Sequence, residues 1–530
     1  MHRLSRTANK RALERQVGSA TRAASESNTR SAFDVEAGNV DSNPAAGGQP
    51  SFKFGSMFSD ARLEPYRPDD KGLIELGRAM QNGPDLGEHP SLLAGYTYLG
   101  QFIAHDLSWD KTGDVPKGPV SPASVEQGRS PFLDLDSVYG DGPDSPDSRL
   151  YNSDQVNLQV GTTAPSVFGD ANRSYENDLP RDKENAENPR RAVIADPRND
   201  ENLAVAQVHV AFLRFHNSVA AALSLDGLFG KDLFKETRRK VIKHYQWIVL
   251  YDFLPKIIDQ SVLRDVLENG PRHFKLKDPR KPFMPVEFSL AAFRLGHSLL
   301  RDSYEWNRVF QSPFRGDLRR ADLFDLSRLT GFSGNMDGTS LTLPSYWIID
   351  WTRFFDFSGF NGIANNPKPN YSGRIDTTLA SALKLMEGFL TQISDPQFRS
   401  LGVVDLIRGS RLGLPAGQDV AAILGVTPLP PSEVAREPHS SILKRYGFHK
   451  KTPLWYYILK EAQLYSGGER LGPVGSRIVA ETIIELMSAT SGSILDGSSN
   501  WKPDLGQVRR DQFGMADLLA FGNTVNPLGS

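Results

Sequence analysis

The sequence predicts a mainly α-helical protein, with one large helical domain, long loops and few short strands. Several segments carry apolar residues at the spacing of a helix, whereas strand-like segments are short and sparse. The expected helices cover residues 91–106, 202–224, 236–251, 288–300, 377–393 and 474–489. The two strand candidates are residues 340–344 and 347–350.

The elements follow in order from local patterns. The first helix is apolar almost throughout, which predicts burial, and Asp200 is the expected cap of the second. The remaining four helices rest on apolar periodicity. Long connections rich in Pro, Gly and Asp separate the helices, at residues 110–135, 140–200, 310–345 and 407–440. Connections of this length in a compact domain are usually functional or organised by a ligand.

Length allows several domains, since 530 residues at about 150 per domain suggest three or four. We expect a disordered tail at residues 1–52 and the helical domain at residues 53–530. The tail has no aromatic residue before Phe33 and buries too little apolar surface to offset its ordering entropy. It lacks the apolar core of a secretory signal, and its Arg/Ser bias is also compatible with an organelle transit peptide. Cytoplasmic residence and leaderless export both fit, and the oligomeric state stays open.

Composition excludes several classes of protein. Lys and Arg number 61 against 63 Asp and Glu, so the chain lacks the basic excess of a nucleic-acid binder. No apolar run reaches the roughly 18 residues of a membrane span. Without cysteine there are no disulfides, thiolate zinc sites or iron–sulfur clusters. A metal must therefore be held by His, Asp, Glu or carbonyl oxygens.

The first candidate motif places Gln101, His105 and Asp106 on the first helix. Gln101 and His105 are four residues apart, so they share a face, while Asp106 points about 100° away. This arrangement offers a polar pair to one site and a carboxylate to another. A buried His bonded to a buried Gln is the alternative.

The second motif alternates oxygen donors along a loop. Ser130, the carbonyl of Phe132, Asp134 and Asp136 recur at every second residue, a pattern that suits a hard cation such as calcium, and Asp106 offers a further carboxylate. A solvated acidic loop is the alternative.

Three further motifs carry Arg and His. Arg198 is a candidate for stabilising negative charge, and a surface pair with Glu201 is its alternative. His297 follows Gly296, which permits a flat group to approach, unless it is a core His. A buried Asp405 needs a partner such as an imidazole N–H, unless it pairs with Arg408 on its own helix.

Together and in this order, the five motifs resemble the animal-type haem peroxidases of the peroxidase–cyclooxygenase superfamily, over about residues 52–510. Segments 95–101, 351–355 and 470–476 look like the bacterial branch. The resemblance implies a helical haem-peroxidase domain, haem b and calcium as cofactors, and hydrogen peroxide as a substrate. It implies these site residues: Gln101, His105 and Arg198 on the distal side, His297 as iron ligand, Asp405 at the proximal Asn position, Arg294 and Arg408 for the propionates, and Asp106, Ser130, Phe132, Asp134 and Asp136 for calcium.

The resemblance also implies roles. His105 would take a proton from peroxide and return it to the leaving oxygen, while Arg198 stabilises the developing charge. Gln101 would hold a water or halide near the iron. Asp405 would accept from His297 and, being a carboxylate, lower the iron potential.

Departures from the family pattern limit haem attachment. Glu201 matches one ester-forming carboxylate, but the other position is Ala104, and Asn202 excludes the sulfonium link. We therefore expect at most one ester, and donors such as bromide, iodide, thiocyanate or phenols rather than chloride. A fatty-acid dioxygenase is the first alternative, although Arg294 stands where cyclooxygenase-like members have a radical Tyr. A calcium-dependent adhesion or haem-carrying protein is the second. The remaining histidines, His209 among them, are interpreted as packing or loop residues.

Overall fold

The computed structural model describes residues 52–58, 63–166, 172–311, 320–330, 340–380, 383, 393–497, 500–506 and 512–529. It is 44% helix and 8% strand, which confirms the predicted class. The helices are α2 (Asp70–Met80), α3 (Gly95–Leu107), α4 (Asp136–Tyr139), α5 (Leu203–Leu225), α6 (Gly230–Trp247), α7 (Leu254–Ile257), α8 (Gln260–Asn269), α9 (Val286–Ser289), α10 (Gly296–Leu299), α11 (Leu323–Arg328), α12 (Leu401–Arg411), α13 (Gly417–Ile423), α14 (Pro431–Val434), α15 (Ser440–Arg445), α16 (Leu454–Ser466), α17 (Pro473–Ser488) and α18 (Met515–Phe521).

Short strands and turns connect these helices. The strands are β1 (Phe52–Gly55), β2 (Glu88–Leu93), β3 (Glu126–Gln127), β4 (Phe283–Pro285), β5 (Ser303–Tyr304), β6 (Ala321–Asp322) and β7 (Tyr371–Gly373). The order β3-β1-β4 forms one small sheet, in which β1 runs antiparallel to β3 and parallel to β4, while β2–β7 and β5–β6 are antiparallel pairs. The 3₁₀ turns η5 (Pro197–Asp200) and η7 (Ala292–Leu295) carry candidate site residues.

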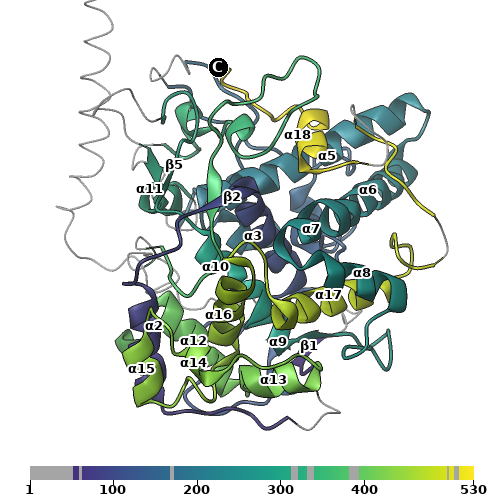
Figure 1. Ribbon diagram of the computed structural model, residues 1–530. Helices are drawn as coiled ribbons and strands as arrows, with labels where there is room; N and C mark the ends of the chain where they lie inside the picture. The colour runs from purple at the N-terminus through teal and green to yellow at the C-terminus, as the bar shows by residue number, and fades with distance from the viewer. Residues whose placement is uncertain are drawn as a thin grey trace, which may run out of the picture.

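The core surrounds α3, which lies in the middle of the molecule between α5 and α10 (Figure 1). Helix α5 is apolar on nearly all faces, and it begins where the Asn202 side chain accepts from the backbone N–H of Val205. Asp200, the expected cap, instead pairs with Arg181. The predicted second helix is confirmed, with its cap two residues later.

Helices α2 and α12 cross at a point where each of them carries a glycine. A Cβ on Gly77 would lie 2.6 Å from the backbone nitrogen of Val403, and one on Gly402 would lie 2.6 Å from the carbonyl oxygen of Gly77. Only glycine permits such an approach. The crossing holds α12, which carries Asp405 and Arg408, against the rest of the molecule.

The segment around residue 297 was predicted as one helix, and this prediction is wrong. The chain forms α9, η7 and α10 in succession, and it leaves helical geometry at Ala291, with φ −133° and ψ −75°. The N–H of Arg294 bonds to the carbonyl of Ala291, and its Nε donates to the carbonyl of Ser289 at 3.2 Å. These bonds replace the continuous helical ladder and set the direction of α10.

Other boundaries also differ from expectation. The first predicted helix begins at Gly95, because residues 88–93 pair with β7. The third runs from Gly230 to Trp247 and continues as a π-helical turn, η6 (Ile248–Phe253). The sixth is confirmed as α17.

Neither strand candidate forms a strand. Around residues 340–344 the contact is a single bridge between Pro344 and Ala164, and within 347–350 the N–H of Asp350 bonds to the carbonyl of Trp306. Most of the predicted helix 377–393 and almost all of the predicted tail lie outside the described residues, and residues 377–380 are not helical. In the part of the chain that the structure describes, no helix has the length and apolarity to cross a membrane.

Candidate active site

Helix α3 carries Gln101 and His105 on one face, as the spacing predicted. Most of the helix is buried, and His105 is only 8% exposed. The neighbours Phe102 and Ile103 are fully buried in the core. The apolar contacts therefore fix the rotation of the helix, and with it the direction of the two polar side chains.

The His105 ring is held at one nitrogen and faces a carboxylate with the other. Its Nδ1 lies 2.9 Å from Oδ1 of Asn199, and its Nε2 lies 3.5 Å from Oε1 of Glu201. Gln101 donates from Nε2 to the same Glu201 oxygen and accepts from Nδ2 of Asn202 at 3.1 Å. The alternative of a His105–Gln101 bond is therefore wrong, because both side chains reach across to the segment after Arg198.

Arg198 lies against the carboxyl end of α3, in the 3₁₀ turn η5. Its guanidinium donates to the backbone carbonyls of His105 at 2.9 Å and Ser108 at 2.7 Å, and to the carboxylate of Asp196 at 2.6 Å. The alternative of a surface pair with Glu201 is wrong, because Asp196 is the acidic partner. Arg198 and His105 are thus brought together, although they are far apart in the sequence.

Asp196 connects Arg198 to a second cation. The buried carboxylate also accepts from Nε of Arg129 at 2.9 Å, and both guanidinium groups lie 5.1 Å from the ring of Trp109. Burial alone would raise the pKa of Asp196, but the charges of Arg198 and Arg129 outweigh it and hold that pKa well below its usual range. Asp196 is consequently ionised and fixes the Arg198 side chain.

His297 and Asp405 form a partly buried pair on the other side of the core. Nδ1 of His297, on α10, lies 2.7 Å from Oδ2 of Asp405, on α12, and the carboxylate is fully buried. Arg294 donates to the other oxygen of Asp405. A Cβ built at Gly296 would meet no atom within 4 Å, and the His297 side chain is 30% exposed. The pair thus leaves Nε2 of His297 available beside an open position.

Arg408 does not pair with Asp405, so the helical ion pair considered for them is wrong. Its Nη2 donates to the backbone carbonyl of Asp114 at 2.9 Å and lies 4.0 Å from Oδ2 of Asp110. Its Nε is buried and has no hydrogen-bond partner among the described residues. A buried cationic donor without a partner is costly, so this position favours an anionic group.

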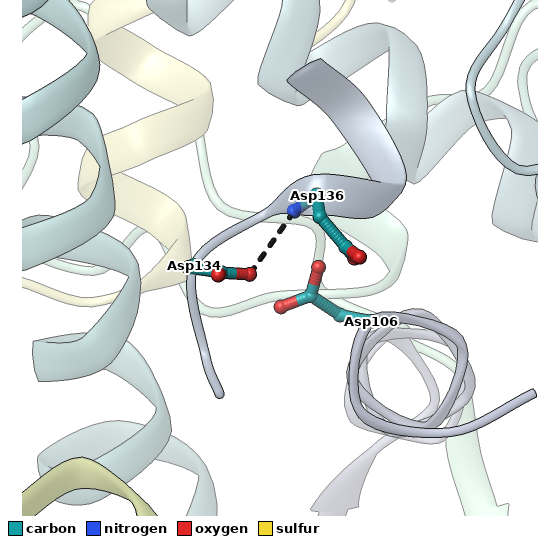
Figure 2. Close-up of side chains that lie close together, drawn as sticks. All are labelled: Asp106, Asp134 and Asp136. Atoms are coloured by element: carbon teal, nitrogen blue, oxygen red, sulfur yellow. Dashed lines mark hydrogen bonds between the residues drawn. The ribbon is translucent and has the colours of Figure 1, made fainter. Parts of the chain in front are cut away.

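Three carboxylates converge beside α3. Oxygen atoms of Asp106, Asp134 and Asp136 all lie within 4.8 Å of one another. Figure 2 shows Asp106 projecting from α3 toward Asp134 in the loop and Asp136 at the start of α4, with the N–H of Asp136 donating to Asp134. Between the two, Leu135 has a left-handed backbone, with φ 57°, and its N–H bonds to Asp106 at 3.3 Å. This conformation is uncommon for leucine, and it turns both carboxylates toward Asp106.

The electrostatics of this acidic cluster call for a cation. Burial raises the pKa of all three carboxyl groups, and the neighbouring carboxylates raise that of Asp106 further. The pKa of Asp136 rises to about 7. The N–H of Ser130 donates to Asp136 and that of Phe132 to the Ser130 hydroxyl, so both belong to the same loop. Their predicted part as oxygen ligands stays a prediction.

Comparison with known proteins matches part of the chain to one family. A family model described as animal haem peroxidase matches residues 96–341, which include His105, Arg198 and His297. Heme peroxidase 2 of Caenorhabditis elegans is 23% identical over 486 residues, 81% of this chain. Residues 96–341 of the chain thus match the animal haem peroxidase family, the same family that the five sequence motifs resemble.

Other relatives in this family match shorter stretches. Mouse thyroid peroxidase is 30% identical over 193 residues, which are 34% of this chain and 20% of that protein. The chain spans 64% of the length of heme peroxidase 2 and 14% of a C. elegans peroxidasin homologue. The match is therefore to a part of longer relatives.

Solved structures share the peroxidase fold. Peroxidase A from Dictyostelium discoideum superposes with a TM-score of 0.59 at 15% identity, covering 91% of this chain and 94% of that one. The fatty acid alpha-dioxygenase of Arabidopsis thaliana gives 0.51 at 14% identity, covering 90% and 76%. The fold is common to both activities, so it does not choose between them.

Sequence reasoning missed part of this candidate site. Asn199, Asp196 and Arg129 were not singled out, and His209 was set aside as a packing residue. Nδ2 of Asn199 lies 3.0 Å from Nδ1 of His209, which joins this buried ring to His105 through one amide. No spacing rule connects residues 105, 199 and 209, since only the packing of α3 against η5 and α5 brings them together.

Proposed function

We propose that the protein is a haem peroxidase that reduces hydrogen peroxide and oxidises halides, thiocyanate or small phenolic donors. The observation that carries this proposal is the pair of histidines, each held at Nδ1, by Asn199 or by Asp405. Holding Nδ1 leaves Nε2 for chemistry: a proton acceptor at His105 and a metal ligand at His297. Residues 95–101, which resemble the bacterial branch, support placing the chain there.

The residues of this chain fit a haem group. His297 would supply the axial nitrogen, and the open position at Gly296 leaves room beside it. The partnerless Nε of Arg408 suits a propionate, as would Arg294, although Arg294 contacts Asp405 in this structure. Haem, when bound, supplies the redox chemistry that divides peroxide into water and an oxidising equivalent.

The side chains on α3 and η5 then handle the proton and the charge. Nε2 of His105 would take the proton of one peroxide oxygen and return it to the leaving oxygen. Arg198, held by Asp196, would stabilise negative charge on that oxygen. Gln101 would orient a water or halide, and its bond to Glu201 sets the direction of its amide.

Asp405 would tune the axial ligand. A carboxylate at Nδ1 gives the imidazole more anionic character than an amide would, which favours the oxidised metal. Arg294 shares this carboxylate and offsets part of its charge. Two positions carry ester-forming carboxylates in mammalian members of the family. One of them is Glu201 here and the other is Ala104, which has no carboxylate, so we propose one ester link to haem at most.

We propose calcium as the second cofactor, held by Asp106, Asp134 and Asp136 with oxygens of Ser130 and Phe132. Hard oxygen donors and three converging carboxylates suit this ion. Because Asp106 follows His105 directly, the ion would brace the end of α3 that carries the base.

Calcium removal should destabilise the protein. A ligand present at 100 times its dissociation constant stabilises a fold by about 2.7 kcal/mol, so strong chelation should lower the melting temperature measurably. The effect of Asp134→Asn on the melting temperature should change sign with the conditions. In calcium the variant should be less stable than wild type, because the ion loses a charged ligand. In chelator it should be more stable, because repulsion among the three carboxylates is relieved.

Asp144→Asn is the matched control for calcium removal. This exposed carboxylate lies near the loop in sequence and pairs with Lys231 at the surface. It should respond to chelator as wild type does. Equal melting temperatures with and without chelator, together with no calcium by metal analysis, would remove the calcium assignment.

The function itself is tested by a UV–visible spectrum of the haem-loaded protein with stoichiometric hydrogen peroxide. A Soret band that shifts, and that returns on addition of bromide, iodide, thiocyanate or a phenol, is the expected result. The donor that returns it fastest identifies the preferred class. A protein that binds haem and leaves peroxide unchanged would contradict the proposal.

A further inference from the structure

A hydrogen-bond chain runs from the His105 ring through Asn199 to His209. The proposed reaction uses neither Asn199 nor His209. Asn199 separates two histidines, with Oδ1 at 2.9 Å from Nδ1 of His105 and Nδ2 at 3.0 Å from Nδ1 of His209. Asn199 and His209 are both fully buried. Both residues are shielded from bulk solvent, so we take the protein partners to decide which atoms donate and which accept.

The amide gives this chain a direction. An amide oxygen only accepts and an amide NH₂ only donates, so Asn199 must accept a hydrogen bond from one ring and donate one to the other. Burial lowers the pKa of His209 to about 3, so this ring is neutral at pH 7 and one of its nitrogens carries a lone pair. Nδ1 of His209 accepts from the amide, which leaves the Asn199 oxygen to accept from His105.

We propose that Asn199, anchored by His209, is a positioning residue that holds His105 in the tautomer with hydrogen on Nδ1 and a lone pair on Nε2. Nε2 of His105 is the nitrogen that faces Glu201. Gln101 donates to the same Glu201 oxygen, so it lies on this side of the ring as well. The opposite tautomer would place a hydrogen on Nε2, where the reaction needs a base. This inference rests on the proposed function, in which Nε2 of His105 accepts the peroxide proton.

The turn η5 holds both ends of the same residue. Arg198 bonds to the backbone carbonyl of His105 at 2.9 Å, while the adjacent Asn199 holds its ring. Asp196 caps this turn by accepting from the N–H of Arg198, which fixes the directions of both side chains. One short segment therefore sets the position and the protonation pattern of the base.

The test measures tautomers directly, without turnover. The full-length chain is labelled with ¹⁵N-histidine and loaded with zinc protoporphyrin, a diamagnetic analogue of haem, and the ring nitrogens are read by NMR. Signals are assigned by their loss in His105→Gln and His209→Gln. In wild type we expect hydrogen on Nδ1 of His105 and on Nε2 of His209.

Two substitutions at Asn199 separate hydrogen bonding from packing. Asn199→Leu, of similar size, should shift most of His105 to the opposite tautomer and slow the reaction of the haem-loaded protein with peroxide about 10-fold, which is less than the about 10²–10⁴-fold loss expected when a positioned acid–base group is removed. Asn199→Asp retains an acceptor, so His105 should keep its tautomer and most of its rate. Because a carboxylate cannot donate, His209 should move its hydrogen to Nδ1.

Asn217→Leu is the matched control. Asn217 lies on α5 and bonds to the backbone of Leu158, so its loss should change neither tautomer and leave the peroxide rate as in wild type. Hydrogen on Nε2 of His105 in the wild-type chain would overturn the inference, as would a wild-type tautomer and rate in Asn199→Leu. The expected tautomers in a chain that ignores peroxide would support the inference and overturn the proposed function.

Discussion

His297→Ala is expected to abolish haem binding. The side chain would supply the axial nitrogen, with Asp405 held at its Nδ1 and an open position beside it at Gly296. The loss should exceed the about 10–100-fold change in affinity typical of residues behind a metal ligand. A haem titration followed at the Soret band measures it directly.

The control for His297→Ala is His449→Ala. His449 lies in the segment before α16, where its Nδ1–H donates to the carbonyl of Leu443, and it makes no described contact with the pair. Its haem affinity should equal that of wild type. A second variant, His297→Gly, should regain haem when imidazole is added, which distinguishes a lost ligand from a lost fold. An unchanged Soret band in His297→Ala would refute the ligand assignment.

His105→Ala has the second largest expected effect, and it acts on rate rather than binding. Haem content should stay at the wild-type level, because His105 lies on α3 and contacts neither His297 nor Asp405 in the described structure. The second-order rate constant for the reaction with peroxide should fall about 10²–10⁴-fold, the usual worth of a positioned acid–base group. Stopped-flow mixing of the haem-loaded protein with peroxide gives this constant.

Gln101→Leu distinguishes the proposed role of Gln101 from that of His105. This substitution removes the amide that bonds to Glu201 and leaves the His105–Asn199 contact in place. We expect a smaller fall in the peroxide rate and a larger change in halide oxidation, since Gln101 is proposed to orient a water or halide. A wild-type peroxide rate in His105→Ala would take the acid–base role away from this residue.

The long buried helices were predictable because burial leaves a periodic signal in the sequence. Helices α5 and α17 carry apolar residues on nearly every face, and their predicted ranges agree with the structure within one or two residues. The segment around His297 has the same apolar character but breaks at Ala291. Apolar periodicity does not reveal such a break. The break is accompanied by side-chain bonds to the backbone, such as that from Arg294 to the carbonyl of Ser289, which leave no periodic signal.

The candidate site was predictable as a set of residue types and not as a set of contacts. Gln101, His105 and Asp106 share one helix, and local geometry alone set their relative directions. The loop carboxylates were recognised by alternation, but the left-handed Leu135 that aims them at Asp106 left no sequence signal. The alternatives for His105, Arg198 and Asp405 all assumed neighbours in sequence as partners, and all three failed for that reason.

By itself, the sequence determined the mainly helical class, the exclusion of cysteine chemistry and the residues that could bind metal or move protons. The tertiary structure decided which nitrogen of each histidine is held, which acid pairs with Arg198, and that Asn199 and His209 lie behind the His105 ring. The physical reason is the separation along the sequence of the residues that interact. Helical periodicity and motif spacing act over a few residues, whereas a hydrogen bond between residues 105 and 199, or 297 and 405, exists only after the core has packed.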